Sequence, residues 1–154
     1  MHQPVMQNEV VELLKIRSDG VYIDGTLGAG GHAEAVLERL GADGRLVGID
    51  RDREALVRAA ARLEKYGNRF RALQGNFADM TALAEKVGVR QADGIVLDLG
   101  MSSDQLDDAR RGFSFLRDGP LDMRMDATGP ITAADLVNSA SEEELAECLR
   151  QLGE

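Results

Sequence analysis

The chain has 154 residues, of which 44% are hydrophobic, and it carries a formal net charge of −9. This length corresponds to about one domain, and the apolar content supports a packed core, which excludes a disordered chain. The negative net charge argues against a protein that binds nucleic acid through a general basic face. The sequence shows no signal peptide and no apolar run near the roughly 20 residues of a membrane span, so we expect a soluble, cytoplasmic protein without a membrane partner.

The N-terminal part predicts a helix within residues 2–17 and a strand at residues 21–23. Residues 25–31 then contain four glycines, and residues 33–40 (AEAVLERL) have the apolar spacing of a helix. A strand, a glycine turn and a helix in this order open a dinucleotide-binding half-sheet. Glycine allows a sharp turn and close approach of a ligand, and the helix start offers unpaired N–H groups.

Two alternatives to this interpretation of the glycine turn remain open. A tight turn without any ligand needs fewer than four glycines, so the pattern favours a ligand. Gly28, Gly30 and Ala33 also fit the fingerprint G-x-G-x-x-(G/A), so a nicotinamide or flavin cofactor is a competitor. The glycine pattern by itself does not identify the ligand.

The second predicted strand, residues 45–49, ends at an acidic residue. Asp50 lies 26 residues after Asp24 (50 − 24), close to the spacing at which an acid binds the ribose hydroxyls of a nucleotide. A carboxylate can accept hydrogen bonds from both hydroxyls. The alternative is that Asp50 caps the next helix, residues 55–65, but Asp52 is the better candidate for that cap.

Two further strands are predicted at residues 69–74 and 93–100, with a helix at residues 80–86 between them. Phe77, in the loop after the first of these, either stacks on an adenine ring or packs under the loop. Residues 95–97 are continuously apolar, as expected of a strand buried on both faces. Asp98 at its carboxyl end is either hydrogen-bonded by the backbone or poised for chemistry.

The last third of the chain is less regular. Residues 101–126 form a polar stretch that is too long for an ordinary connection, but it contains apolar residues that argue for order: Phe113, Phe115, Leu121, Met123 and Met125. Thr132 opens a helix at residues 133–138, and Ser141 with Glu144 forms a capping box ahead of residues 145–152. Cys148 in that helix is expected to be a small apolar filler.

Four strands leave the last one with an unpaired apolar edge, which a complete doubly wound sheet would cover. The sequence therefore looks like the first half of a longer fold.

Several runs of the sequence strongly resemble the MraW/RsmH family. These runs are residues 22–32 (YIDGTLGAGGH), 48–52 (GIDRD), 98–107 (DLGMSSDQLD), 111–115 (RGFSF) and 119–126 (GPLDMRMD). The resemblance implies an S-adenosylmethionine-dependent methyltransferase that acts on the N4 of a cytidine in 16S rRNA of the small ribosomal subunit.

The family's fold, an α/β Rossmann-like class I methyltransferase sheet with an inserted helical domain, implies two parts here. Residues 1–108 would form the first half of the cofactor-binding domain, with about four parallel strands, and residues 109–154 would begin the insertion. Family members are about twice as long, so this chain lacks the rest of the insertion and the remaining strands. A cofactor-binding fragment without catalysis is therefore an alternative, and a nicotinamide-dependent oxidoreductase is a weaker one.

The resemblance also implies the residues that bind S-adenosylmethionine, and it implies no metal. The cofactor residues are Gly30, Gly31, His32, Asp50, Phe77, Asp98 and Gln105. We expect Asp98 to be catalytic as well, because a carboxylate beside the cofactor can orient the cytosine amine or accept its proton. This role rests on location, since the segment lacks the Pro-Pro-aromatic sequence of other amino-methyltransferases.

The expected RNA partner fits poorly with the local charge. Four arginines between residues 110 and 124 are outnumbered by aspartates between residues 104 and 126. We therefore expect the missing half or ribosomal proteins to supply contacts to the RNA. The sequence leaves the oligomeric state open.

Overall fold

The computed structural model describes residues 6–153, and its contacts divide the chain after Gly100 into two compact units, Met1–Gly100 and Met101–Glu154. Each unit is described by itself. The predicted domain boundary after residue 108 concerns the start of an insertion and stays a prediction.

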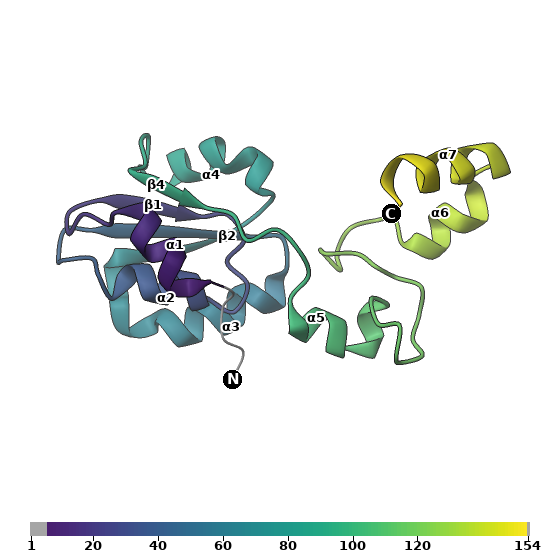
Figure 1. The fold of residues 1–154 in the computed structure, drawn as a ribbon, viewed down its shortest axis with the longest axis horizontal. Helices are drawn as coiled ribbons and strands as arrows, with labels where there is room; N and C mark the ends of the chain where they lie inside the picture. Colours follow the sequence, from purple (N-terminus) through teal and green to yellow (C-terminus); the bar gives the residue numbers. More distant parts are fainter. Residues whose placement is uncertain (1–5, 154) are drawn as a thin grey trace. The chain divides into compact units, whose positions relative to one another are not determined.

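The first unit is built on a parallel sheet. Its strands are β1 (Val21–Asp24), β2 (Arg45–Asp50), β3 (Phe70–Gln74) and β4 (Gly94–Val96). They pair in the order β3-β2-β1-β4, all in parallel (Figure 1). The four predicted strands are confirmed. The strand order reverses at β1, since the chain moves outward through β2 and β3 and then returns to the other side, and such a reversal marks the ligand crevice of an open α/β sheet.

Helices cover both faces of this sheet. They are α1 (Gln7–Leu14), α2 (Gly31–Leu37), α3 (Arg53–Leu63) and α4 (Met80–Lys86). Side chains alternate between the faces along each strand: Tyr22, Leu46 and Phe70 share a core with residues of α2 and α3. Ile23 and Val47 point the other way and pack with residues of α4. Figure 1 shows α4 on the side of the sheet opposite α2 and α3.

The predicted fourth strand is too long, and its expected burial is wrong. β4 covers only residues 94–96; Ile95 is 48% exposed and Leu97 is 42% exposed, while Val96 is buried. The reason is that β4 is an outer strand, paired with β1 alone among the described residues. The unpaired apolar edge expected from the sequence is confirmed.

The second unit is dominated by short helices. These are α5 (Ser103–Asp107), the 3₁₀ turn η3 (Ala109–Arg111), α6 (Ala133–Ser139) and α7 (Glu142–Leu152). Capping boxes begin α5, α6 and α7, because a hydroxyl before each helix and the third helical residue satisfy each other's backbone N–H groups. The predicted box of Ser141 and Glu144 is confirmed. Neither α6 nor α7 has a buried residue.

Two expectations for this unit need correction. Phe113 is buried, but Phe115 is fully exposed, so the aromatic residues do not jointly order the stretch. The buried guanidinium of Arg111 contributes instead, donating hydrogen bonds to the carbonyl oxygens of Arg124 and Met125 at 3.1 and 2.7 Å. Cys148 is exposed and is not an apolar filler, because no residue of α7 is buried.

Candidate cofactor site

Three carboxylates follow three neighbouring strands at the same edge of the sheet. Asp24 ends β1, Asp50 ends β2, and Asp98 comes two residues after β4. Because β1 lies between β2 and β4, these side chains meet where the strand order reverses. The candidate site is therefore the region around these aspartates and the glycine loop, residues 25–31.

Asp50 is held against the glycine loop. Its Oδ2 accepts a hydrogen bond from the backbone N–H of Gly28 at 2.8 Å, and its Oδ1 accepts one from Asp52 at 2.9 Å. Asp52 caps α3, as predicted, and the N–H from which it accepts is that of Glu54. Each oxygen of a carboxylate can accept a second hydrogen bond, so the half-buried Asp50 retains acceptor capacity for a pair of hydroxyls.

Two glycines of the loop have different roles. Gly28 and Gly30 both have left-handed backbone angles, with φ of +52° and +81°, which cost other residues free energy. A Cβ on Gly30 would lie 3.1 Å from Leu63 and 3.3 Å from Ala59, so Gly30 lets the loop pack closely on α3. A Cβ on Gly28 would meet only a backbone oxygen at 3.9 Å, so the loop is open there.

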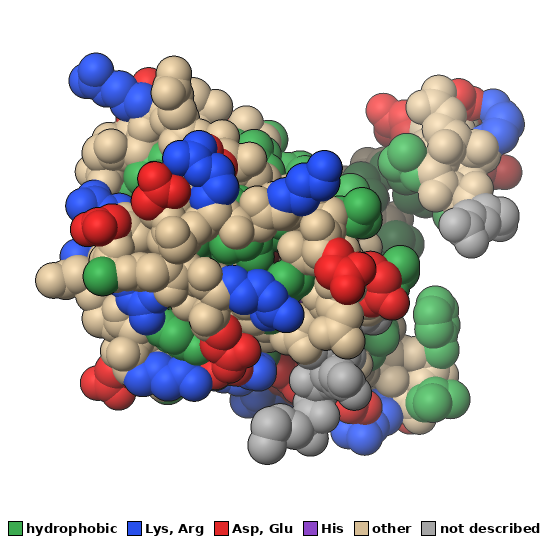
Figure 2. Space-filling model, turned by 60° about the vertical axis from the view of Figure 1, so that its left-hand side comes forward, with side chains coloured by type: hydrophobic (Ala, Val, Ile, Leu, Met, Phe, Trp, Pro, Cys, Tyr) green, Lys and Arg blue, Asp and Glu red, His purple; other side chains and the backbone are tan. Residues whose placement is uncertain are grey.

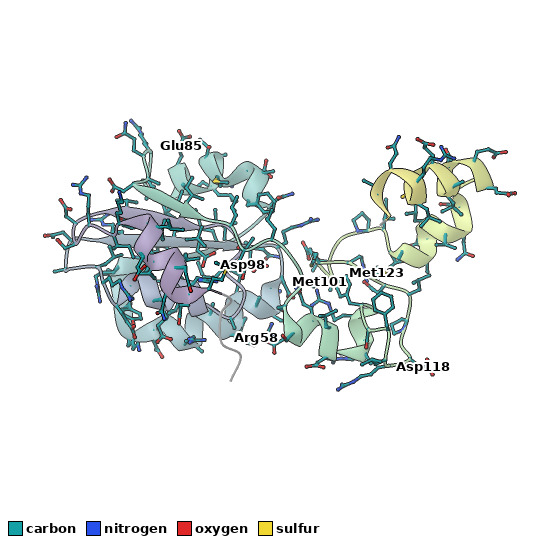
Figure 3. All side chains as sticks on the ribbon, viewed as in Figure 1. Arg58, Glu85, Asp98, Met101, Asp118 and Met123 are labelled. Atoms are coloured by element: carbon teal, nitrogen blue, oxygen red, sulfur yellow. The ribbon has the colours of Figure 1, made fainter. Side chains whose placement is uncertain are left out.

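Asp98 is fixed by residues of the glycine loop and α2. Its backbone N–H donates to Oγ1 of Thr26 at 2.7 Å, and its Oδ2 lies 3.5 Å from Nε2 of His32. The His32 side chain is 8% exposed, whereas that of Asp98 is 53% exposed. Figure 3 marks Asp98 where the chain leaves β4. The arrangement holds the Asp98 backbone in place and leaves its carboxylate accessible.

Phe77 borders the same loop. It begins the 3₁₀ turn η2 (Phe77–Asp79), which Asn76 caps by accepting from the N–H of Ala78. Its Cβ lies 3.1 Å from where a Cβ on Gly25 would stand, and its side chain is half-buried. This contact shows packing against the loop; stacking on adenine stays a prediction.

Gln105 lies in the second unit and has a local structural role. Its Oε1 accepts from the backbone N–H of Ser102 at 3.0 Å, which completes the capping box of α5. The side chain is buried. Its contact with a cofactor stays a prediction.

Asp24 was not singled out by the sequence as a site residue. It is 2% exposed, and its Oδ1 accepts from the N–H of Thr26 at 3.1 Å. Its Oδ2 is buried and has no hydrogen-bond partner among the residues that the structure describes. Burial raises the pKa of Asp24 to about 7 because a charged carboxylate loses hydration. The Thr26 hydrogen bond opposes this pKa shift, and Asp50 and Asp98 add to it. The signal in the sequence that could have identified Asp24 is its position as an acid directly before the glycine turn.

On one face of the molecule, surface charge does not point to a separate site. Acidic and basic side chains are interspersed on the face shown in Figure 2. Among residues 6–153, no helix combines the length and the apolar character needed to cross a bilayer.

Sequence comparison places the chain among methylases. Residues 1–154 match the MraW methylase family. The chain is 54% identical over 153 residues to ribosomal RNA small subunit methyltransferase H of Geobacter sulfurreducens and 48% identical to the protein of that name from Symbiobacterium thermophilum. The alignments cover 99% of this chain but 49% and 48% of the relatives. The chain thus spans about half the length of the curated relatives it matches.

Structural comparison identifies the fold. The O-methyltransferase TomG of Streptomyces achromogenes, solved in complex with SAM, superposes with a TM-score of 0.54 at 21% identity, over 64% of this chain and 45% of that one. NSun6 of Pyrococcus horikoshii gives a TM-score of 0.51 at 21% identity, over 64% and 24%. The first unit has the Rossmann-like fold of class I methyltransferases, as predicted.

Proposed function

Since this chain belongs to the MraW methylase family, we propose that its glycine loop and strand-end aspartates bind S-adenosylmethionine for methylation of small-subunit ribosomal RNA. The finer proposal is that the methyl group goes to N4 of a cytidine in 16S rRNA, in the cytoplasm. Family membership favours methyl transfer over the hydride transfer that the glycine pattern also allowed.

The observation that carries cofactor binding is the geometry of Asp50. Two backbone N–H groups, of Gly28 and Asp52, orient its carboxylate beside the open side of the loop. An acid at the end of β2 beside a glycine loop is the arrangement that binds ribose hydroxyls in Rossmann-like folds. Gly30, Gly31, His32, Phe77 and Gln105 are proposed as further cofactor residues on the family resemblance.

The residues also fit a positively charged methyl donor. The site gathers Asp24, Asp50 and Asp98, and in the described part of the chain one oxygen of Asp24 lacks a hydrogen-bond partner. A sulfonium near this set would lower the free energy of the carboxylates. When bound, the cofactor supplies an electrophilic methyl group.

Asp98 is the proposed group that handles the proton of the target amine. The amine of cytosine is a weak nucleophile because its lone pair is delocalised into the ring, so transfer needs an oriented amine that loses a proton. Asp98 would take up the proton that the amine nitrogen loses when the methyl group passes to it from the sulfur of the donor. Thr26 holds the Asp98 backbone, and the exposed carboxylate can reach a base that has left its stack.

Contacts to RNA are proposed to come mainly from outside these residues. Arg110 pairs with Asp108 at 2.8 Å, and Arg124 pairs with Asp122 at 2.6 Å. Arginines held by neighbouring carboxylates offer less charge to phosphates than free ones. The part of the relatives that this chain does not span, or the ribosomal subunit itself, would supply the remaining contacts.

Calorimetric titration of S-adenosylmethionine into the chain, with NAD as control ligand, tests the cofactor proposal. We expect binding of the former alone. We also expect a loss of roughly tenfold or more in affinity for Asp50→Asn, because replacing one carboxylate oxygen by an amide group removes the charge and the charge-assisted hydrogen bonds to two hydroxyls. Asp43→Asn, in an exposed turn, is the matched control. Binding of NAD instead, or equal affinities of the three proteins, would contradict the proposal.

The alternative of a cofactor-binding unit without catalysis is favoured by one observation, the coverage of about half of each relative. Methylation assays on 30S particles distinguish the two functions once cofactor binding is established. Binding without methyl transfer would assign catalysis to the longer protein only.

A further inference from the structure

Asp24 is a buried acid of the proposed cofactor site that takes no part in the proposed proton transfer. It is 2% exposed, and its Oδ2 has no hydrogen-bond partner within residues 6–153. A buried polar atom is ordinarily satisfied, and an unsatisfied one costs free energy. This free-energy cost has one of two explanations. Either the oxygen has a function other than stabilising the fold, or it carries a proton in the ligand-free chain.

The charged groups around Asp24 are mainly of its own sign. From the end of β2 comes Asp50, and from the segment after β4 comes Asp98; both disfavour the charged form of Asp24. From α2 comes His32, whose Nε2 lies 3.5 Å from Asp98. Thr26 supplies an N–H to Oδ1 and favours the charged form. Desolvation outweighs that hydrogen bond, so the pKa of Asp24 reaches about 7.

We propose that Asp24 makes the site select by ligand charge: a sulfonium-bearing donor binds with loss of the Asp24 proton, whereas the thioether product left after methyl transfer binds with less proton loss. This inference rests on the proposed function, since it takes the ligand to be S-adenosylmethionine. The positive sulfur stabilises the carboxylate form of Asp24, which is buried away from water, and the neutral sulfur of the product does not. Asp24 thereby favours donor over product.

The direction of the pH dependence follows from linkage. Because the donor prefers the chain with Asp24 deprotonated, its affinity rises as the pH rises through the pKa of about 7. For complete proton loss on binding, the donor affinity rises about tenfold between pH 6 and pH 8. The ratio of donor to product affinity rises over the same range.

Calorimetry in two buffers of different ionisation enthalpy measures both the affinity and the number of protons released on binding. S-adenosylmethionine and S-adenosylhomocysteine are titrated at pH 6, 7 and 8 into the native chain, into Asp24→Asn and into Asp43→Asn. Asparagine matches the shape of the protonated aspartate, and circular dichroism checks the fold. We expect the donor to release several tenths of a proton at pH 7 from the native chain and from Asp43→Asn, and substantially less from Asp24→Asn.

Carboxyl ¹³C NMR of the native chain provides a measurement that needs no variant. We expect the Asp24 resonance to titrate near neutral pH in the free chain and at lower pH with the donor bound. An Asp24 titration in the ordinary acidic range, or equal proton release from native chain and Asp24→Asn, overturns the inference and leaves the proposed function intact. Absence of S-adenosylmethionine binding overturns both.

Discussion

At the residue scale, neighbouring aspartates of the site have different surroundings. Asp24 is buried, and one of its oxygens has no partner among the described residues, whereas Asp98 is exposed and anchored through its backbone to Thr26. A proton acceptor has to reach its substrate, so exposure favours Asp98 for catalysis. The same carboxyl group can therefore have different chemical roles at the two positions.

Replacing Asp98 separates catalysis from cofactor binding. In a protein extended to the length of the relatives, we expect Asp98→Ala to lose 100-fold or more in methylation rate, the typical contribution of a general base, with only a small change in S-adenosylmethionine affinity. Single-turnover methylation of 30S particles and calorimetry measure the two effects. Equal losses in both would instead make Asp98 a cofactor-binding residue alone.

At the element scale, the glycine loop depends on the helix behind it. Gly30 has a positive φ and also faces Ala59 and Leu63 of α3 at close range. Gly88 has nearly the same φ, +79°, but a Cβ there would meet nothing within 4 Å. The pair separates the free-energy cost of backbone conformation from that of close packing.

We expect Gly88→Ala to lower the free energy of unfolding by about 1–2 kcal/mol, the cost of left-handed backbone for a residue with a Cβ. Gly30→Ala should lower it by about 1–3 kcal/mol more, because the added methyl group also overpacks the contact with α3. Urea unfolding followed by circular dichroism measures both. Equal destabilisation by Gly88→Ala and Gly30→Ala would show that α3 accommodates the added methyl group without a loss of free energy.

At the scale of the whole molecule, burial is unevenly divided between the two units. The buried core clusters consist of residues before Gly100, while α6 and α7 bury no residue. Helices without a buried face rely on caps and local propensity, which contribute little free energy. The capping boxes of α6 and α7 are consistent with this dependence on local interactions.

Hydrogen exchange should report this division directly. We expect the amides of β1 and β2, in the middle of the sheet, to exchange slowest and those of α6 and α7 to exchange fastest, since exchange follows local opening. Mass spectrometry after timed exchange in D₂O measures both. Protection of α7 comparable to that of β2 would mean that another surface covers this helix in solution.

The sequence by itself determined the features that depend on neighbours along the chain. Residues 133–138 and the box of Ser141 and Glu144 were predictable because capping is a contact over three residues. The position of Asp50 at a strand end followed from β-branched runs and glycine turns with the spacing of a nucleotide-binding fold.

Only the tertiary structure decided which groups lose water. The exposure of Ile95 depends on β4 being an outer strand, and the burial of Asp24 depends on β1 lying between β2 and β4. Likewise, the pairing of Asp98 with Thr26 and His32 joins segments that are 72 and 66 residues apart in the sequence (98 − 26 and 98 − 32). Burial and long-range contact are properties of the packed chain, so local patterns indicate where an acid lies but not whether it is charged.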